Sequence, residues 1–236
     1  MKKIISFFFL VLISAIVFAQ KEIKIKKKDR KKNIELVTSY GNIILRLSDS
    51  TPLHRDNFIR LVKTGYYDSV LFHRVIKSFM IQSGDPNSKH AEPGQPLGNG
   101  GPEYTVPAEF RVTLFHHKGV LAAARSGDDV NPQKASSGSQ FYIVQGKKFS
   151  DAGLDSVETF RLKGRKIPVE QREVYKTIGG TPHLDQNYTV FGEVVSGLDI
   201  ADKIADTPTS KAEDRDRPLE DIRIIKATLV KRKKHY

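Results

Sequence analysis

Short runs of alternating apolar and polar residues predict β-strands along most of the chain. Residues 33–38 and 42–47 alternate around residues 39–41, a pattern typical of a β-hairpin. Further runs have the length and composition of strands, at residues 71–76, 79–84, 119–124, 139–145, 190–195 and 221–230. This series of short strands favours a mainly β fold, and a closed eight-stranded antiparallel barrel would leave no exposed sheet edge.

Two segments carry the signals of helices. Thr51 is suited to cap a helix, Pro52 fits its first position, and Gly65 fits the left-handed residue that ends it. Phe58 and the apolar residues three and four positions later form one buried stripe. The apolar residues between 197 and 205 repeat helical spacing and predict the second helix.

The sequence FHRVIKSFMIQSGD, which begins at Phe72, combines two predicted strands with polar residues that can take part in chemistry. Alternation places Arg74 on the same face as Phe72. On the next strand it places Met80 and Gln82 on one face and Phe79 on the other. An arginine and a glutamine are therefore expected on adjoining strands, beside apolar side chains.

Arg74 has two possible roles on such a pair of strands. A guanidinium offers five donors and stays protonated, so in an apolar concavity it suits electrostatic stabilisation rather than acid–base chemistry. The alternative is an ion pair on the outer face of a barrel, because barrel strands often carry such pairs. Spacing alone leaves both interpretations open.

Three sequence motifs resemble those of the cyclophilins, the peptidyl-prolyl cis-trans isomerases that bind cyclosporin. FHR…FM.Q.GD at residues 72–85 resembles the central motif of the family. GSQFYI at 138–143 resembles its GSQFFI, and VFGEV at 190–194 resembles its VFGKV. The motifs follow the family's order, and the resemblance extends from about residue 33 to residue 230. It implies a barrel capped by two helices and an activity that rotates X–Pro peptide bonds.

The resemblance also implies a mechanism and a set of site residues. As the X–Pro bond twists, the prolyl nitrogen becomes a hydrogen-bond acceptor, and Arg74 matches the arginine that acts as its donor. Gln82 matches the glutamine that orients this arginine, so these two residues are the expected catalytic pair. No nucleophile, metal, cofactor or proton transfer is needed. The expected substrate-binding residues are Phe79, Met80, Tyr142 and Leu184 around the proline ring, with Ala124, Arg125, Gln140, His183 and Tyr188 beside it. For each apolar residue of this set, the alternative is ordinary core packing.

Several positions depart from the family pattern. Arg125 replaces the usual asparagine, and Tyr142 replaces a phenylalanine. His183 stands in place of the cyclosporin-binding tryptophan, so cyclosporin is expected to bind weakly. Tyr188 stands where many members have a histidine, which keeps an aromatic wall but removes a titratable ring. None of these changes removes the arginine, the glutamine or the apolar pocket.

The segment 147–181 is longer than the loop that is typical of cyclophilins at this position. It is expected to be a partly helical insertion. Residues 154–162 and 169–176 have helical patterns. The segment lies in sequence between Gln140 and Leu184, so it should lie near the rim of the site. The hypothesis is that it shapes access for protein substrates. Deleting its helices would then lower activity on a folding protein and spare activity on a short peptide.

The net charge of +12 lies at the two ends of the chain. Lysines and arginines at residues 2–3, 21–32 and 231–234 account for it, so residues 33–230 are neutral overall. A nucleic-acid-binding domain would carry its positive charge on the fold itself, so nucleic acid is not the expected partner. The basic ends are interpreted as solvated arms that aid solubility or, alternatively, contact an anionic envelope surface. Because the chain has no cysteine, disulfides and thiol chemistry are excluded.

The first residues predict export. Lys2 and Lys3 precede an apolar run from 4 to 18, and Val17 and Ala19 are suited to a signal-peptide cleavage site. A membrane anchor is the alternative, but the apolar run falls short of the roughly 20 residues that span a bilayer. The predicted division is a signal peptide at 1–19, a basic linker at 20–32, the isomerase domain at 33–230 and a basic tail at 231–236.

The leading hypothesis is a monomeric isomerase exported to the periplasm, which acts on proline-containing polypeptides and has no stable membrane insertion after signal cleavage. The main alternative is a cyclophilin-like binding module or chaperone with little turnover. Arg74 and Gln82 favour the enzyme, because a binder needs no donor at the prolyl nitrogen. A metal site at His116 and His117 is not expected, since adjacent strand residues face opposite ways and no carboxylate cluster is near in sequence.

Overall fold

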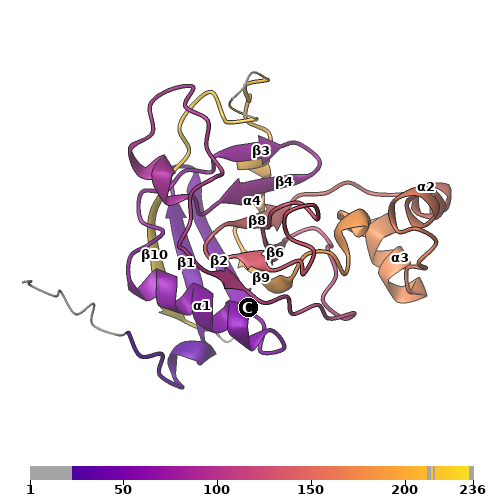
Figure 1. Ribbon diagram of the computed structural model, residues 1–236, viewed down its shortest axis with the longest axis horizontal. Helices are drawn as coiled ribbons and strands as arrows, with labels where there is room; N and C mark the ends of the chain where they lie inside the picture. Colours follow the sequence, from indigo (N-terminus) through magenta and orange to yellow (C-terminus); the bar gives the residue numbers. More distant parts are fainter. Residues whose placement is uncertain (1–22, 212–213, 215, 234–236) are drawn as a thin grey trace, which may run out of the picture.

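An antiparallel sheet of eight strands forms the body of the molecule, as the computed structural model in Figure 1 shows. The structure describes residues 23–211, 214 and 216–233. The strands follow the spatial order β10-β1-β2-β9-β6-β8-β4-β3. Their bounds are β1 Lys32–Thr38, β2 Gly41–Leu47, β3 Arg74–Ile76, β4 Met80–Ser83, β6 Val120–Ala123, β8 Phe141–Val144, β9 Val190–Ser196 and β10 Ile224–Lys231. A small second sheet, absent from the prediction, pairs β5 (Thr105–Val106) with β7 (Ser136–Ser137).

The large sheet is an open half-barrel, not the closed barrel that the strand count favours. β3 is three residues long, and the chain before it meets the chain before β10 at an isolated bridge between Leu71 and Arg223. Near this bridge the N–H of Phe72 donates to the carbonyl of Ile222 at 2.8 Å. Because β3 is too short to pair with β10 along its length, the ladder does not close.

The described residues contain four α-helices rather than the two that were expected to cap a barrel. The two predicted helices are α1 (Pro52–Lys63), which lies across the lower end of the sheet in Figure 1, and α4 (Leu198–Ala205). The other two, α2 (Asp151–Ser156) and α3 (Val169–Thr177), lie in segment 147–181. The shorter helical turns are η1 Asp29–Lys31, η2 Pro86–His90, the π-helical η3 Val157–Arg161, and η4 Pro182–Leu184.

Helix α1 begins without the predicted side-chain cap. Thr51 occupies the N-cap position, but its hydroxyl makes no capping bond. Instead, the carboxylate of Glu109 accepts the N–H groups of Leu53 and His54 at 3.2 and 3.0 Å. A carboxylate at this end also interacts favourably with the helix dipole. The other end is as predicted, since Gly65 has a φ of +68°.

Apolar side chains gather on both faces of the sheet. The larger cluster lies inside the half-barrel and includes Ile81 on β4 and Ile143 on β8. The alternating neighbours Met80 and Tyr142 belong to a smaller cluster on the opposite face. Strand periodicity therefore assigns faces correctly within β4, and β8 shows the same alternation.

The same periodicity fails for two phenylalanines that lie just outside the strands. Phe72 precedes β3 and packs in the larger cluster, not on the face of Arg74. Phe79 precedes β4 and packs in the smaller cluster together with Met80, not opposite it. Both residues lie in irregular backbone, where side chains need not alternate.

Segment 147–181 projects from the sheet in Figure 1 and has a small apolar core of its own. Leu154, Leu162, Ile167 and Tyr175 are buried together in this core. Phe115, from the chain before β6, packs against it and thereby joins the segment to the sheet.

Glu158 fastens the helical parts of this segment. Its carboxylate accepts bonds from Lys166 at 2.7 Å, from the N–H of Ile167 at 3.0 Å and from Arg172 at 2.9 Å. Burial works to raise the pKa of Glu158, but these three donors outweigh burial and hold the pKa at about 2. The carboxylate therefore stays ionised at neutral pH and joins residues 166–167 to α3.

The sheet begins before residue 33, because Lys32 is the first residue of β1. Asp29 is buried and pairs with Lys63 of α1 at 2.9 Å. Part of the basic segment 20–32 is thus packed against the domain.

The predicted signal peptide, residues 1–19, and the last three residues of the predicted tail lie outside the described residues. Among the helices of the described part, none has the length and apolar character needed to cross a membrane.

Candidate active site

Four strands bring one row of side chains onto the outer face of the half-barrel. Arg74 on β3 pairs with Gln82 on β4. Gln82 in turn pairs with Tyr142 on β8, which pairs with Ala122 on β6. Residues opposite each other in antiparallel strands point to the same face. The strand register therefore places the arginine, the amide and the aromatic ring side by side.

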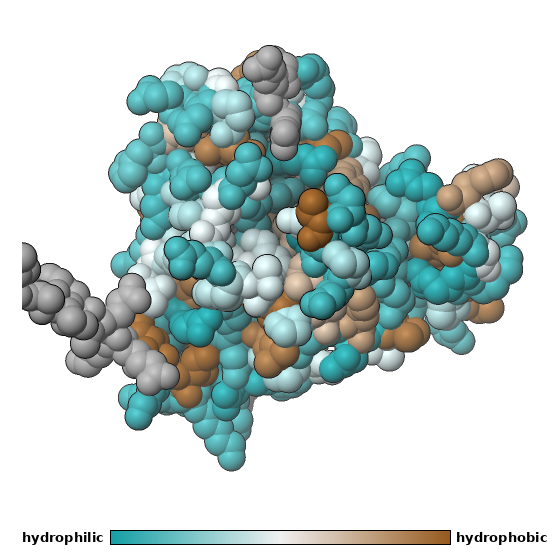
Figure 2. Space-filling model, viewed as in Figure 1, coloured by the Kyte–Doolittle hydropathy of each residue, from teal (hydrophilic) through white to brown (hydrophobic). Residues whose placement is uncertain are grey.

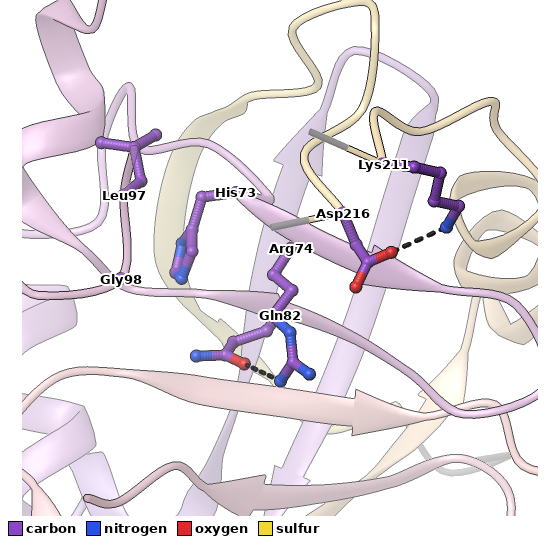
Figure 3. Close-up of a pocket in the computed structure, with 7 residues that line it drawn as sticks. All are labelled: His73, Arg74, Gln82, Leu97, Gly98, Lys211 and Asp216. Carbon is purple, nitrogen blue, oxygen red and sulfur yellow. Dashed lines mark hydrogen bonds and ion pairs between the residues drawn. The ribbon is translucent and has the colours of Figure 1, made fainter. Parts of the chain in front are cut away.

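A chain of hydrogen bonds orients the guanidinium of Arg74. One of its terminal N–H groups donates to Oε1 of Gln82 at 3.4 Å, as Figure 3 shows. Nε2 of Gln82 donates to Oε1 of Gln140 at 3.0 Å. Nε2 of Gln140 donates to the carbonyls of Gly98 and Gly100 at 2.9 and 2.7 Å. Because the side-chain N–H groups of Gln140 bond to the loop carbonyls, its oxygen is free to accept from Gln82. The amide of Gln82 is thereby oriented with its own oxygen toward Arg74.

The loop that receives this chain is itself organised by a buried carboxylate. Asp85 accepts the N–H groups of Asn87 at 2.8 Å, of Gly98 at 2.6 Å and of Gly100 at 3.2 Å. A Cβ added at Gly100 would overlap Oδ1 of Asp85. Only glycine therefore lets this backbone close around the carboxylate and hold Gln140.

A cavity of about 140 Å³ opens beside this row. It is smaller than the roughly 300 Å³ at which pockets for drug-sized ligands begin, so it suits one ring rather than a large ligand. Nine of the predicted site residues line it: Arg74, Phe79, Met80, Gln82, Ala124, Arg125, Tyr142, Leu184 and Tyr188. Residues from β3, β4 and β8 thus meet residues of the connecting segments at one apolar hollow, which the guanidiniums of Arg74 and Arg125 border.

The other two predicted residues lie next to this cavity. Gln140 lines a neighbouring cavity of about 620 Å³, which shares Gln82, Ala124 and Arg125 with the first. The ring of His183 stacks on Phe79, with centroids 5.7 Å apart. Burial, together with the nearby positive charge of Arg161, lowers the pKa of His183 to about 4. His183 is therefore uncharged at neutral pH and extends the apolar wall.

Ala124 has both main-chain groups engaged inside the protein. Its N–H donates to the carbonyl of Gln140 at 3.0 Å, and its carbonyl accepts the N–H of Ser137 at 2.8 Å. The N–H of Ala124 is therefore not free to bond a peptide at this edge.

The side chain of Arg125 is fixed at the rim of the cavity. Its guanidinium carbon lies 4.5 Å from the ring centroid of Tyr188, a cation–π contact. The same guanidinium donates to the carbonyl of Asn187 at 2.7 Å and pairs with Asp128 at 2.7 Å. The positive charge is therefore partly compensated within the protein, and the arginine covers the tyrosine.

Tyr142 presents its ring to the cavity and its hydroxyl to the protein interior. The hydroxyl lies 3.0 Å from Nε2 of His116, and the ring Nδ1 of His116 lies 2.9 Å from Oδ1 of Asp185. Both ring nitrogens of His116 are thus engaged by protein groups. Burial also holds the pKa of Tyr142 well above its ordinary value, so its hydroxyl stays neutral. Neither His116 nor Asp185 was a predicted site residue, because the two lie 69 positions apart in sequence.

On the other side of Arg74, a cavity of about 480 Å³ is bounded by His73, Leu97 and the ion pair of Lys211 with Asp216. Figure 3 shows the ring of His73 turned toward the Leu97–Gly98 loop, away from the guanidinium of Arg74. Burial lowers the pKa of His73 to about 4, so it is neutral at physiological pH. Arg74 is therefore the charged group that faces the small cavity from β3.

The sequence profile described as "Cyclophilin type peptidyl-prolyl cis-trans isomerase/CLD" matches residues 33–229. The chain belongs to this family. Residues 33–229 thus form a cyclophilin-type peptidyl-prolyl cis-trans isomerase domain, as the sequence motifs predict.

Relatives support the assignment over most of the domain. A protein of Staphylococcus saprophyticus named "Putative peptidyl-prolyl cis-trans isomerase" is 36% identical over 197 residues, which cover 82% of this chain and 89% of that protein. "Peptidyl-prolyl cis-trans isomerase-like 2" of Rhizopus delemar is also 36% identical, over 208 residues. The Rhizopus match covers 86% of this chain but 30% of that protein. A match to a bifunctional relative from Streptococcus pyogenes covers 37% of the relative, so this chain spans about a third of the length of these two proteins.

A solved structure shares the fold. The crystal structure of a cyclophilin type peptidyl-prolyl cis-trans isomerase from Cryptosporidium parvum superimposes with a TM-score of 0.60. The superposition covers 86% of this chain and 99% of the other, at 22% sequence identity. At this identity the likeness establishes the cyclophilin fold alone.

Proposed function

We propose that this protein catalyses X–Pro rotation in exported proteins, with Arg74 as the donor that stabilises the transition state. Rotation about the peptide bond breaks amide resonance, which imposes a barrier of about 18–20 kcal/mol. In the twisted state the prolyl nitrogen regains its lone pair. A donor that bonds this lone pair stabilises the transition state more than either ground state, which is the condition for catalysis.

The geometry around Arg74 is the observation that carries this proposal. The guanidinium lies at the edge of the small apolar cavity, and the amides of Gln82 and Gln140 fix its direction. An arginine keeps its proton at any physiological pH, so it acts here as a hydrogen-bond donor and not as an acid. Its charge is most effective where apolar walls exclude water.

We assign the proline ring to the cavity walls formed by Phe79, Met80, Tyr142 and Leu184. These four side chains share one apolar cluster with the floor residues of β6 and β9. A ring held there presents its nitrogen toward β3, the strand that carries Arg74. The larger neighbouring cavity, lined by Gln140 and Arg125, would receive the residues that precede the proline.

A protease-coupled peptide assay tests the catalytic role. Arg74→Ala is expected to lower kcat/KM about 100- to 1,000-fold, the cost typical of removing one donor from a preorganised site. Arg46→Ala is the matched control, since Arg46 pairs with Glu193 across the neighbouring strands β2 and β9 and lines neither cavity beside Arg74. A parent protein with no measurable isomerase activity would favour the binding-module alternative instead.

The histidine at position 183 leads to a second prediction, which concerns the affinity for cyclosporin. Because His183 stands where cyclosporin-binding relatives have tryptophan, cyclosporin is expected to bind weakly, and His183→Trp is expected to tighten binding. Isothermal titration of both proteins measures this. A nanomolar Kd for the parent protein would contradict it.

Export to the periplasm is proposed from residues 1–19 alone. If these residues form a cleaved signal, the mature protein begins at Gln20. Mass spectrometry of the protein from fractionated cells decides the point. An uncleaved chain in the cytoplasmic fraction would refute the proposal, without affecting the isomerase assignment.

Segment 147–181, which we interpret as an insertion relative to other cyclophilins, is proposed to contact non-native protein chains. It exposes three apolar side chains, Phe160, Val169 and Ile178, and Figure 2 shows hydrophobic patches over the projecting α2–α3 part. Phe160, 78% exposed, is the most prominent of the three. Exposed apolar patches of this kind often mark interaction surfaces.

The contact is tested with a protein whose refolding is limited by a proline. Phe160→Ser is expected to lower the acceleration of refolding severalfold and to leave the rate on a short peptide unchanged. Leu219→Ser is the control, because Leu219 is 70% exposed but lies outside the segment. Equal refolding rates for parent and Phe160→Ser would end the proposal.

A further inference from the structure

A buried chain of four polar side chains runs from segment 147–181 to the wall of the small cavity. The hydroxyl of Tyr175, on α3, donates to Oδ2 of Asp185 at 2.6 Å. Oδ1 of Asp185 meets the ring of His116 at 2.9 Å, and the far side of that ring meets the hydroxyl of Tyr142 at 3.0 Å. All four side chains are at most 4% exposed.

The partners of Asp185 limit the direction of the hydrogen bonds in this chain. Oδ1 of Asp185 accepts the backbone N–H of His116 at 2.8 Å, and an ionised carboxylate can only accept. A neutral ring at His116 then carries its proton on Nδ1, which leaves Nε2 as an acceptor. In this tautomer the hydroxyl of Tyr142 donates to Nε2. Its proton points away from the cavity, and the ring is held in one orientation as a wall.

The same network also holds the opposite wall. Asp185 directly follows Leu184, whose side chain lines the cavity. On the other side of Leu184, the N–H of Thr181 donates to the carbonyl of His116 at 2.8 Å. Leu184 thus lies on a short turn whose two ends, Thr181 and Asp185, both bond to His116.

The end of the segment approaches His116 very closely. Gly180 forms bridges with His117 and with Lys147, so the two ends of segment 147–181 meet beside the network. A Cβ on Gly180 would overlap the carbonyl of His116. The ring of Phe115 completes the contact, edge to face with Tyr175 at 5.5 Å. The segment is therefore packed directly against the residues that carry the pocket walls.

We propose that Tyr175 is a positioning residue for proline binding: through Asp185 and His116 it holds Leu184 and Tyr142 at the spacing that fits the ring. This inference rests on the proposed proline pocket and extends it to the projecting segment. Loss of the Tyr175 hydroxyl loosens the pocket in ground and transition states alike. It therefore raises KM and leaves kcat nearly unchanged, unlike loss of the donor Arg74.

One consequence changes the expected result of deleting the segment. A deletion that removes α3 also removes Tyr175 and the anchor of Asp185. Deletion is therefore predicted to weaken binding of a short peptide as well as of a folding protein. Only substitutions on the outer surface, such as Phe160→Ser, separate the two roles.

Kinetics of Tyr175→Phe test the inference, with Tyr40→Phe, a tyrosine of the turn between β1 and β2, as the control for loss of a hydroxyl. Tyr175→Phe is expected to raise KM roughly three- to tenfold with kcat within about twofold of the parent. Its effect should shrink when Tyr142→Phe has already removed the far end of the network, because contacting residues are not additive. Circular dichroism and urea unfolding establish that each variant is folded.

Unchanged KM in folded Tyr175→Phe would overturn the inference, as would an equal fall in kcat. If Arg74→Ala is inactive in the same assay, the proposed function still stands in either case. Should Tyr175→Phe fail to fold, Arg165→Ala provides the same test. Arg165 donates to the carbonyl of Asp185 at 2.6 Å from within the segment, so its loss is expected to raise KM too, and an unchanged KM would again overturn the inference.

Discussion

His54 and His116 lie in different parts of the molecule, but each bonds to a carboxylate and to a hydroxyl in the same way. The backbone N–H and the ring Nδ1 of His54 both meet Oε2 of Glu109, at 3.0 and 2.7 Å, and Nε2 meets the hydroxyl of Ser136 at 2.9 Å. His116 meets Asp185 in the same way, at 2.8 and 2.9 Å, and its Nε2 meets the hydroxyl of Tyr142.

The two networks differ in the surroundings of the residue that supplies the hydroxyl, which is Ser136 beside His54 and Tyr142 beside His116. Ser136 is 1% exposed, so the order Ser–His–carboxylate has no catalytic meaning here, because no substrate can reach the oxygen. That network caps α1 and joins it to β7. Tyr142, by contrast, has its ring at the cavity that we assign to proline. Hydrogen-bond geometry alone does not assign a role; access to a cavity does.

The largest expected effect in this comparison comes from His54→Leu. It leaves the buried carboxylate of Glu109 without the hydrogen bond from its ring donor, and such a loss at a buried charged group typically costs about 3 kcal/mol or more. We expect the free energy of unfolding to fall by about that amount, measured by urea titration. The kcat/KM of the folded fraction should stay at the parent value, and a large loss of activity in folded protein would contradict the structural role.

His116→Leu removes the corresponding histidine from the network that reaches the cavity. It is expected to destabilise the protein by about 3 kcal/mol for the same reason and, in addition, to raise KM about tenfold because Tyr142 and Leu184 lose their anchor. Stability and kinetics are measured on the same preparation. If the two histidine variants have identical kinetics, the two networks do not differ in function.

Acidification should act on the buried histidines as a group. Burial lowers the pKa of His54, and it lowers those of His73 and His183 to about 4. Since an unfolded histidine has a pKa of about 6.5, the unfolded state takes up protons first, and stability is lost as pH falls from about 6.5 toward 4. At pH 5.5 each fully buried histidine is expected to cost roughly 1 kcal/mol.

Urea unfolding at a series of pH values measures this loss, and His54→Leu provides the control. Without its imidazole, the variant should lose stability less steeply between about pH 6.5 and about pH 5 than the parent does. Equal slopes would show that His54 is not held in its neutral form.

The smallest effect is expected for Ser136→Ala. It removes one neutral hydrogen bond from His54, which typically costs about 1 kcal/mol. Activity should not change, since Ser136 lines neither cavity beside Arg74. A fall in kcat/KM for this variant would mean that the first network also reaches the site.

Local signals in the sequence were sufficient for much of the fold. The first hairpin and α1 are predicted because each is bounded by residues that start or end it, such as Pro52 and Gly65. Barrel closure is not predictable this way, because it depends on how far β3 extends. The β5–β7 sheet has two residues in each strand, which is too short for any periodic pattern.

For the site, the family motifs identify residues that the structure then gathers at adjoining cavities. What they omit is the layer behind the pocket. His116 and Asp185 lie 69 positions apart, and Glu109 and His54 lie 55 apart, so no local spacing reveals either pair. The helix cap shows the same limit, since the carboxylate of Glu109 replaces the adjacent Thr51.

The central claim is that Arg74 acts on the transition state and not on binding. NMR exchange spectroscopy on a peptide with one X–Pro bond tests it directly, because it measures binding and cis–trans exchange in the same sample. The account predicts that Arg74→Ala binds the peptide with a Kd within about threefold of the parent and leaves exchange near its uncatalysed rate. A variant that binds and still accelerates exchange as fast as the parent would contradict it.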